Sequence, residues 1–262
     1  MRVIGIYSFP KSGNTWLRTI LGEAMGKRKR KIPDLHKQAF AASHEFKGMR
    51  FFKSHSGSNL VVSGRGEHLG TTNVIHIRRN PLDVFVSYLN YISDNVQRAA
   101  PIGFESVETI HGTQLFDLYF HTFVTAGHLS LGFAHETGSY FEHNRFWLEQ
   151  DEVPVVHLRY EDMLHAPLEA LEEVRGLIGL DEAEMARAVH GAADLTQQDG
   201  KFFWKQEEGN YLNYLSQEQI ELFLAYRGKD CLALGYPPDY LRNPKGYPHH
   251  TPHRPNSAKM RL

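Results

Sequence analysis

The stretch SFPKSGNTW, residues 8–16, decides the fold of this chain. It follows VIGIY, residues 3–7, a short apolar run bounded by turn formers and therefore typical of a buried strand. Beyond it, apolar residues that include Leu17 and Ile20 recur at helical spacing, which predicts a helix from about Thr15. A strand, a polar loop that contains a glycine, and a helix, in this order, make up the first unit of a nucleotide-type α/β fold.

Three more apolar runs predict strands, and polar residues follow each of them. They are MRFF (residues 49–52), NVIHI (73–77) and VPVVHL (153–158). One helix is expected from Pro81, with Asn80 as its cap, and another over residues 181–193. A helix should also begin at Pro167, with Leu168, Leu171, Val174 and Ile178 turned inward, and one more should follow the capping-box pair Ser216 and Gln219. We predict a single α/β domain over residues 1–243, with a central, mostly parallel sheet flanked by helices. Residues 244–262, rich in Pro, His and basic residues, are predicted to form a mobile tail.

Composition narrows the classes of function. The 262 residues carry a net charge of −1, which gives no global signal for binding to nucleic acid or to a membrane surface. The single cysteine, Cys231, excludes an intramolecular disulfide and fits a reducing compartment. No apolar run approaches the roughly 18 residues of a membrane helix, and the N-terminal run is too short for a signal peptide. These observations predict a soluble, cytoplasmic protein, and they carry no signal of its oligomeric state.

The loop after the first predicted strand is a candidate phosphate site. A strand-to-helix turn directs free backbone N–H groups and the positive end of the helix dipole towards one point. Lys11 adds a positive charge, and Ser12 and Thr15 add hydroxyl donors, while Gly13 lets the backbone come close to a ligand. The loop is not a Walker A motif, because Pro10 stands where that motif has its second glycine. An ordinary capped helix start with an exposed lysine is the alternative.

Two other predicted strands end in basic residues. Ligands of an open parallel sheet bind beyond the carboxyl ends of its strands. Arg78 and Arg79 stand at one such end, and guanidinium groups match phosphate oxygens, so a polyanion bound without metal is expected there. A surface arginine pair is the alternative. Lys53 and His55 stand at another, which makes His55 a candidate general base. The chain has 16 histidines, so a structural or surface role is the alternative for any one of them.

Two conspicuous stretches have simpler explanations. The basic run KRKRK, residues 27–31, is more typical of a solvated loop than of an anion site. Phe116, Tyr119, Phe120 and Phe123 recur at helical spacing, which favours core packing over a substrate pocket.

Taken together, the motifs resemble those of the PAPS-dependent sulfotransferases, whose donor PAPS is 3′-phosphoadenosine 5′-phosphosulfate. The similar stretches are KSGNTW (residues 11–16, the 5′-phosphosulfate loop), FKSH (52–55, the segment with the family's base), RNPLDVFVS (79–87, the 3′-phosphate motif), GSYFEHNRFW (138–147) and YEDM (160–163). They occur in the family's order, and the resemblance spans about residues 3–236.

The resemblance implies a role for each matching residue. Lys11 would contact the 5′-phosphosulfate and the oxygen that bridges phosphorus and sulfur. Lys53 and His55 would flank the sulfur and the acceptor hydroxyl, with His55 as the base. The remaining implied donor-binding residues are Ser12, Gly13, Asn14 and Thr15 at the 5′-phosphosulfate, Trp16 and Tyr160 at the adenine, and Arg79 and Ser87 at the 3′-phosphate. The product would be PAP, adenosine 3′,5′-bisphosphate, and no metal is expected.

Three departures modify this expectation. Asn14 and Ser54 stand where the family more often has threonine. Trp204-Lys205-Gln206 corresponds to the family's late Arg-Lys-Gly segment, in which only the lysine is kept. The resemblance therefore implies a 3′-phosphate contact from Lys205 within a cover that differs from the family's.

The sequence thus predicts an enzyme that transfers a sulfuryl group in line from PAPS to a hydroxyl of a small alcohol or phenol. No nucleic-acid or membrane partner is expected. One alternative is a Mg²⁺-dependent small-molecule or nucleotide kinase with a degenerate phosphate loop, which a requirement for divalent metal would reveal. The other is a non-catalytic module that binds anions or nucleic acid, which salt-sensitive binding to DNA or RNA would reveal.

Overall fold

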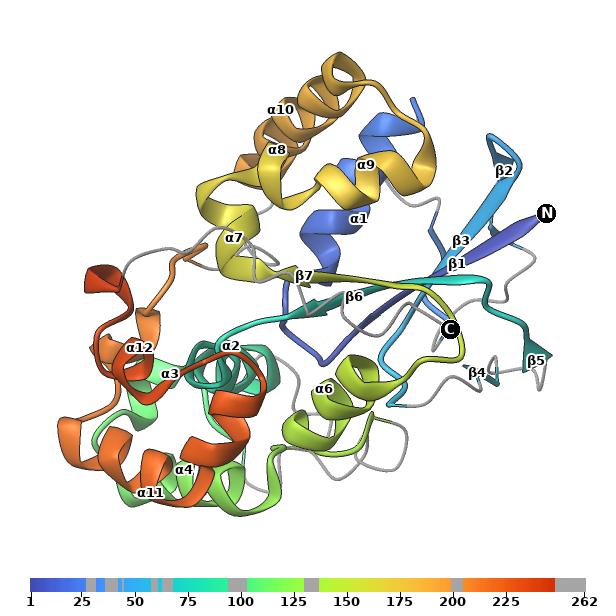
Figure 1. Cartoon of the computed structure of the whole chain (residues 1–262). Coiled ribbons are helices and arrows are strands. Elements are labelled where there is room, and N and C mark those ends of the chain that lie inside the picture. Colours follow the sequence, from blue (N-terminus) through green and yellow to red (C-terminus); the bar gives the residue numbers. More distant parts are fainter. Residues whose placement is uncertain are drawn as a thin grey trace.

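A computed structural model describes residues 1–26, 32–35, 42–43, 45–57, 61–62, 68–93, 103–129, 137–198 and 205–247 (Figure 1). The basic run at residues 27–31, Trp204 and the chain from residue 248 onward lie outside the described residues. The features predicted for these segments therefore remain predictions.

A mostly parallel sheet forms the centre of the described part of the chain. Its five strands lie in the order β2-β3-β1-β6-β7. They are β1 (Arg2–Ser8), β2 (Glu45–Phe46), β3 (Met49–Ser54), β6 (Asn73–Arg78) and β7 (Val155–Arg159). All pairs are parallel except that of the short edge strand β2 with β3. The predicted sheet is confirmed, and four strands end at the same edge. Outside it, β4 (Val61–Val62) and β5 (His68–Leu69) pair with each other.

Helices cover both faces of the sheet (Figure 1). One face carries α1 (Asn14–Ala24), α7 (Tyr160–His165), α8 (Pro167–Ala170), α9 (Glu172–Ile178) and α10 (Glu182–Gln198). The other carries α2 (Pro81–Ser93), α3 (Val107–Ile110), α4 (Gln114–Ala126), α6 (Tyr140–Glu149), α11 (Gln217–Ala233) and α12 (Pro238–Arg242). Two short 3-10 helices, η2 (Asn210–Asn213) and η3 (Pro244–Gly246), lie in the C-terminal part. Buried apolar clusters lie on both faces, which explains why the central strands read as continuous apolar runs.

The local signals of helix starts are largely confirmed. Asn80 Oδ1 accepts a hydrogen bond from the Leu82 amide at 2.9 Å, and Ser216 caps α11 in a reciprocal bond with Gln219. The helix predicted from Pro167 is wrong in one respect, because it is divided into α8 and α9. α8 is a single turn that buries no residue, so Leu168 is 41% exposed instead of turned inward.

The aromatic helix α4 belongs to the core, as predicted. Phe116 and Phe120 are buried and contact the ring of Phe85 on α2, with centroids 5.7 and 5.6 Å apart. Near residue 247, where the described residues stop, Asn243 Oδ1 accepts a hydrogen bond from the Gly246 amide, and Pro244 of η3 is buried.

Candidate active site

The β1–α1 loop (residues 9–13) has the backbone geometry of an anion cradle. Lys11 and Gly13 have φ angles of 69° and 100°, in the left-handed region. The Gly13 carbonyl accepts from the amides of Trp16 and Leu17, which starts α1 directly behind the loop. A Cβ at Gly13 would lie 2.5 Å from Cδ2 of Tyr160. Only glycine therefore combines this conformation with such a close approach of the loop to the Tyr160 ring.

Two buried donors near this loop have no hydrogen-bond partner among the described residues. Ser12 is fully buried, and within the described residues its Oγ makes no hydrogen bond. Nε of Arg79, a residue that is 9% exposed, also makes no hydrogen bond within the described residues. Burial and then the nearby Arg79 lower the pKa of Lys11 to about 8. Buried donors without partners, close to the positive charges of Lys11 and Arg79, fit a bound polyanion. Without a ligand, such unpaired buried polar groups would cost stability.

Arg79 links the loop to the C-terminal part of the chain. Its Nη1 donates to the Lys11 carbonyl at 3.4 Å and its Nη2 to the Glu207 carbonyl at 3.2 Å. The guanidinium lies over the Tyr160 ring, 4.3 Å from its centroid. The Tyr140 hydroxyl donates to the Arg79 carbonyl, which holds the backbone at the end of β6. The guanidinium plane is thus fixed on three sides.

His55 is oriented by the end of β1. Its Nδ1 lies 2.6 Å from the carbonyl oxygen of Ser8, and Asn14 Nδ2 donates to Ser8 Oγ at 3.2 Å. Because a carbonyl oxygen only accepts hydrogen bonds, Nδ1 carries the proton and donates it. The lone pair of the neutral ring then belongs to Nε2.

Lys53 forms a buried ion pair. Its Nζ lies 3.1 Å from Asp34 Oδ2, with only 5% of the lysine side chain exposed. The backbone of residues 33–35 brings the partner there, because the Lys53 amide donates to Pro33 and its carbonyl accepts from Leu35. The ammonium position is therefore set by an irregular segment alongside β3.

The remaining predicted residues are distributed around this centre. Tyr160 is buried, and its ring centroid lies 5.8 Å from that of the half-buried Trp16. Thr15 is exposed, and Ser87 is half-buried on α2. Lys205 is exposed. The structure thus gathers most predicted residues, with Lys205 at the start of the described C-terminal part of the chain.

Several polar residues around the site were not predicted. They are Ser8 and Asp34, described above, and the buried carboxylates of Asp83, Glu161 and Glu208. Glu161 accepts from the Asn80 amide at 2.7 Å and from the Tyr236 hydroxyl at 3.0 Å. Glu161 lies two residues after β7, within YEDM, and Ser8 and Asp83 lie within SFPKSGNTW and RNPLDVFVS, so their positions carried a signal. The roles of all five residues depend on contacts between distant segments.

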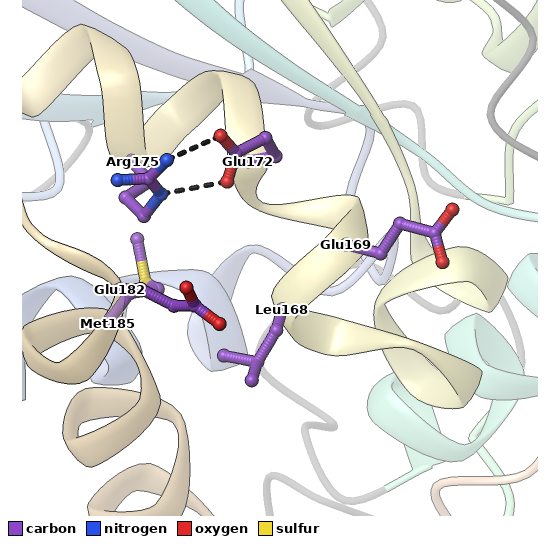
Figure 2. A pocket seen from close by; sticks show the side chains of 6 residues that line it. All are labelled: Leu168, Glu169, Glu172, Arg175, Glu182 and Met185. Atoms are coloured by element: carbon purple, nitrogen blue, oxygen red, sulfur yellow. Dashed lines mark hydrogen bonds and ion pairs between the residues drawn. The ribbon is translucent and has the colours of Figure 1, made fainter.

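A pocket of about 360 Å³ lies elsewhere, between α8, α9 and α10 (Figure 2). In it, Arg175 pairs with Glu172 through two hydrogen bonds of 2.5 and 2.8 Å, and Glu169 points away from the other labelled side chains. Its lining includes three glutamates and none of the residues predicted for the donor. Such a lining does not suit a polyanion, so we do not assign the active site there.

The described residues offer neither a metal-binding group nor a membrane-spanning helix. Among them, no group of three or more His, Cys, Asp or Glu side chains is placed to hold a metal ion. None of the described helices has the length and apolarity needed to cross a membrane.

Fold and site together define an α/β protein in which the parallel strands end beside a loop with the geometry of a phosphate-binding site, residues 9–13, and beside the buried Arg79. The model of the sulfotransferase domain matches residues 2–230, and the chain belongs to the sulfotransferase family. Family membership makes it a PAPS-dependent enzyme that releases PAP.

Known proteins agree with this assignment. The chain is 24% identical to mouse sulfotransferase 1B1 over 258 residues, which cover 84% of this chain and 79% of the relative. It is 29% identical to cytosolic sulfotransferase 14 of Arabidopsis thaliana over 176 residues, 58% of this chain and 46% of the relative. Its fold is similar to that of mouse sulfotransferase SULT7A1 complexed with PAP, with a TM-score of 0.64 and 18% identity over 92% of this chain and 87% of that one.

Proposed function

We propose that the enzyme transfers the sulfuryl group of PAPS to a hydroxyl of a small-molecule alcohol or phenol, with His55 as the general base. The observation that carries the proposal is the 2.6 Å contact between His55 Nδ1 and the Ser8 carbonyl. It assigns the lone pair to Nε2, the nitrogen that would take the acceptor proton. The acceptor oxygen then forms its bond to sulfur as the bond from sulfur to the bridging oxygen breaks. The products are a sulfate ester, PAP and the proton on His55.

Charge develops on the bridging oxygen, and Lys11 would stabilise it. The lysine is half-buried, and its pKa of about 8 reflects burial and then the neighbouring Arg79. An anion bound between the two cations would favour the charged ammonium, since an opposite charge at close range raises the pKa of an amine. Lys53 would add a second positive charge, held in place by Asp34. Preorganised charges of this kind act without reorganisation during the reaction.

The roles that the family resemblance implies for the other donor-binding residues complete the proposal. Ser12 Oγ would donate to the 5′-phosphosulfate, with the backbone of Gly13, Asn14 and Thr15 beside it. Arg79 Nε, a buried donor without a partner among the described residues, would donate to the 3′-phosphate, together with Ser87 of α2. Trp16 and Tyr160, whose rings lie 5.8 Å apart edge to face, would contact the adenine. Lys205, an exposed cation, would add a contact to the 3′-phosphate.

The half-buried ring of Tyr91 supports an apolar acceptor, whereas the rings of Phe9, Tyr88 and Tyr140 are buried in one core cluster. Tyr91 lies under the Lys11 ammonium at 4.9 Å. Such surfaces bind the apolar body of an alcohol or phenol, while His55 orients its hydroxyl.

The decisive test compares His55→Asn with the wild-type enzyme. Asparagine places an amide donor where His55 has Nδ1–H, so the bond to Ser8 is kept while the base is lost. We expect turnover with a panel of phenols and alcohols to fall about 10²–10⁴-fold, while PAP binds with unchanged affinity in calorimetry. His190→Ala, at an exposed histidine on α10, is the control. Near-wild-type turnover in His55→Asn would exclude His55 as the base.

A second measurement tests the donor contacts. PAP without metal should raise the melting temperature of the wild-type protein, because a ligand at 100 times its Kd adds about 2.7 kcal/mol of stability. Arg79→Ala should largely lose this shift. A shift produced only by ATP with Mg²⁺ would favour a kinase instead, and an unchanged PAP affinity in Arg79→Ala would contradict the assigned 3′-phosphate contact.

A further inference from the structure

The segment that follows Trp204 is held by buried carboxylates. We call residues 205–211 the late segment. Lys205 and Gln206 have φ angles of 56° and 51°, a left-handed conformation in two consecutive residues that are not glycine. Side chains disfavour this conformation, so it persists only where the surroundings hold it. The contacts that hold the late segment therefore determine where its backbone lies.

Asp83 of α2 holds the C-terminal end of the late segment. Its two carboxylate oxygens accept from the amides of Gly209 at 2.8 Å and Tyr211 at 3.2 Å. The Tyr211 hydroxyl in turn donates to the Leu241 carbonyl at 2.6 Å. Asp83 is 2% exposed, so these bonds are shielded from water.

Glu208 holds the middle of the late segment from within. Its carboxylate lies 2.5 Å from Nε2 of His165, the last residue of α7, and accepts from the Tyr240 hydroxyl of α12 at 2.6 Å. The Glu208 side chain is 4% exposed, whereas that of His165 is 42% exposed. The carboxylate thus ties the late segment to two helices on opposite faces of the sheet (Figure 1).

The residue before Glu208 contacts the donor site. The Glu207 carbonyl accepts from Arg79 Nη2, one of the two backbone contacts that orient the guanidinium. If Glu208 lost its partners, the carbonyl one residue away would move, and Arg79 would lose one of its two fixed points. The Nε of Arg79, buried and without a partner among the described residues, would then no longer point in one direction.

We infer that Glu208 is a positioning residue for recognition of the donor's 3′-phosphate. It acts through the Glu207 carbonyl and Arg79, and it does not touch the donor. The family has a basic Arg-Lys-Gly segment here, of which this chain keeps only Lys205. In this chain the buried Glu208 carboxylate fixes the backbone that contacts Arg79, and this fixed position takes the place of the missing positive charge. The inference rests on the proposed contact of Arg79 with the 3′-phosphate.

The test uses two nucleotides that differ only in the 3′-phosphate, namely PAP and adenosine 5′-monophosphate. Calorimetry at a temperature where every variant is folded gives a Kd for each, and their ratio measures recognition of the 3′-phosphate. In Glu208→Ala, we expect the Kd for PAP to rise about tenfold, equivalent to about 1.4 kcal/mol, while the Kd for the monophosphate stays within about twofold. Tyr240→Phe, which removes one donor to the carboxylate, should change the ratio in the same direction.

Two controls separate this role from general effects. Asp239→Ala removes a negative charge from α12 at a side chain that is 86% exposed and pairs with Arg242, and it should leave the ratio unchanged. Glu208→Gln keeps one acceptor oxygen for Tyr240, so its ratio of the two Kd values should lie between those of Glu208→Ala and the wild-type enzyme. This variant also keeps the role measurable if Glu208→Ala does not fold.

The outcomes are distinct. An equal loss of affinity for both nucleotides, or no loss for either, in Glu208→Ala and Glu208→Gln would overturn the positioning role. If the wild-type enzyme itself bound PAP no more tightly than the monophosphate, the proposed 3′-phosphate contact would fail first, and the inference would fail with it.

Discussion

Replacing Gly13 with alanine tests the shape of the donor loop. A Cβ at Gly13 would lie 2.5 Å from Tyr160 Cδ2, a distance that side chains do not tolerate, so the ring or the loop must move. Gly26 provides a matched control, because it also has a positive φ, 66°, and lies just beyond the other end of α1. Among the described residues, nothing lies within 4 Å of a Cβ built there. Gly26→Ala therefore imposes only backbone strain, whereas Gly13→Ala adds a steric conflict.

The magnitudes follow from these two causes. Alanine in the left-handed conformation costs about 1–2 kcal/mol, partly offset by about 0.4–1 kcal/mol from the lower entropy of the unfolded chain. We therefore expect Gly26→Ala to lower the free energy of unfolding by about 0–1.6 kcal/mol. Overpacking typically costs a further 1–3 kcal/mol or so, and Gly13→Ala should be less stable than Gly26→Ala by about that amount. Urea unfolding without nucleotide measures both, and only Gly13→Ala should also weaken PAP binding.

A double-mutant cycle provides the refutation. In a Tyr160→Ala background the ring is absent, so a Cβ at residue 13 has room. Gly13→Ala should then cost about 1–3 kcal/mol less than it does beside the ring, and the strain of its φ of 100° remains. If Gly13→Ala cost the same with and without the Tyr160 ring, the steric reasoning would be wrong and backbone strain alone would explain the glycine.

Two further predictions concern buried charges. Asp34→Asn should destabilise the enzyme by about 1–3 kcal/mol in urea unfolding, because the buried Lys53 ammonium loses its counter-charge; a loss below 0.5 kcal/mol or so would contradict a buried pair. Burial, and then the charge of Arg78, lowers the pKa of His157 to about 4, and burial lowers that of His143 to about 3. The unfolded chain takes up protons near pH 6.5 that the folded chain does not, so stability should fall as the pH drops from about 6.5 towards 4. Each histidine should contribute about 2 kcal/mol to the loss between pH 7 and 5, and His157→Gln should reduce the pH dependence measured by urea unfolding.

The architecture was predictable because it follows from local patterns. The apolar runs 49–52 and 73–77 correspond to β3 and β6, each extended by one or two residues. The capping side chains of Asn80 and Ser216 lie where their helices begin. Periodicity records which side chains are buried, so it locates elements well. It does not show where the buried apolar face of a helix begins or ends. Leu168 fits the apolar spacing, yet it is exposed because α8 is a single turn at the surface.

The positions of the site residues were also predictable, but their orientations were not. A motif places His55 beyond β3, yet the proton on Nδ1 is assigned by a carbonyl of β1, 47 residues earlier in the chain. Likewise, the partner of Lys53 comes from the irregular residues 32–35, which carry no periodic pattern. Such partners become visible only when the sheet brings separate segments to one edge.

Arg79 illustrates why the late segment could not be judged from its composition. The loss of two residues of the family's Arg-Lys-Gly segment suggests a weakened donor site, because a positive charge is missing. In the structure the late segment contributes a carbonyl to Arg79, and two buried carboxylates, Asp83 and Glu208, hold that carbonyl in place. A fixed guanidinium loses less conformational freedom on binding a phosphate than a mobile one does. Order at one arginine can therefore compensate for a missing charge, and this compensation depends on contacts 126 residues apart in the chain.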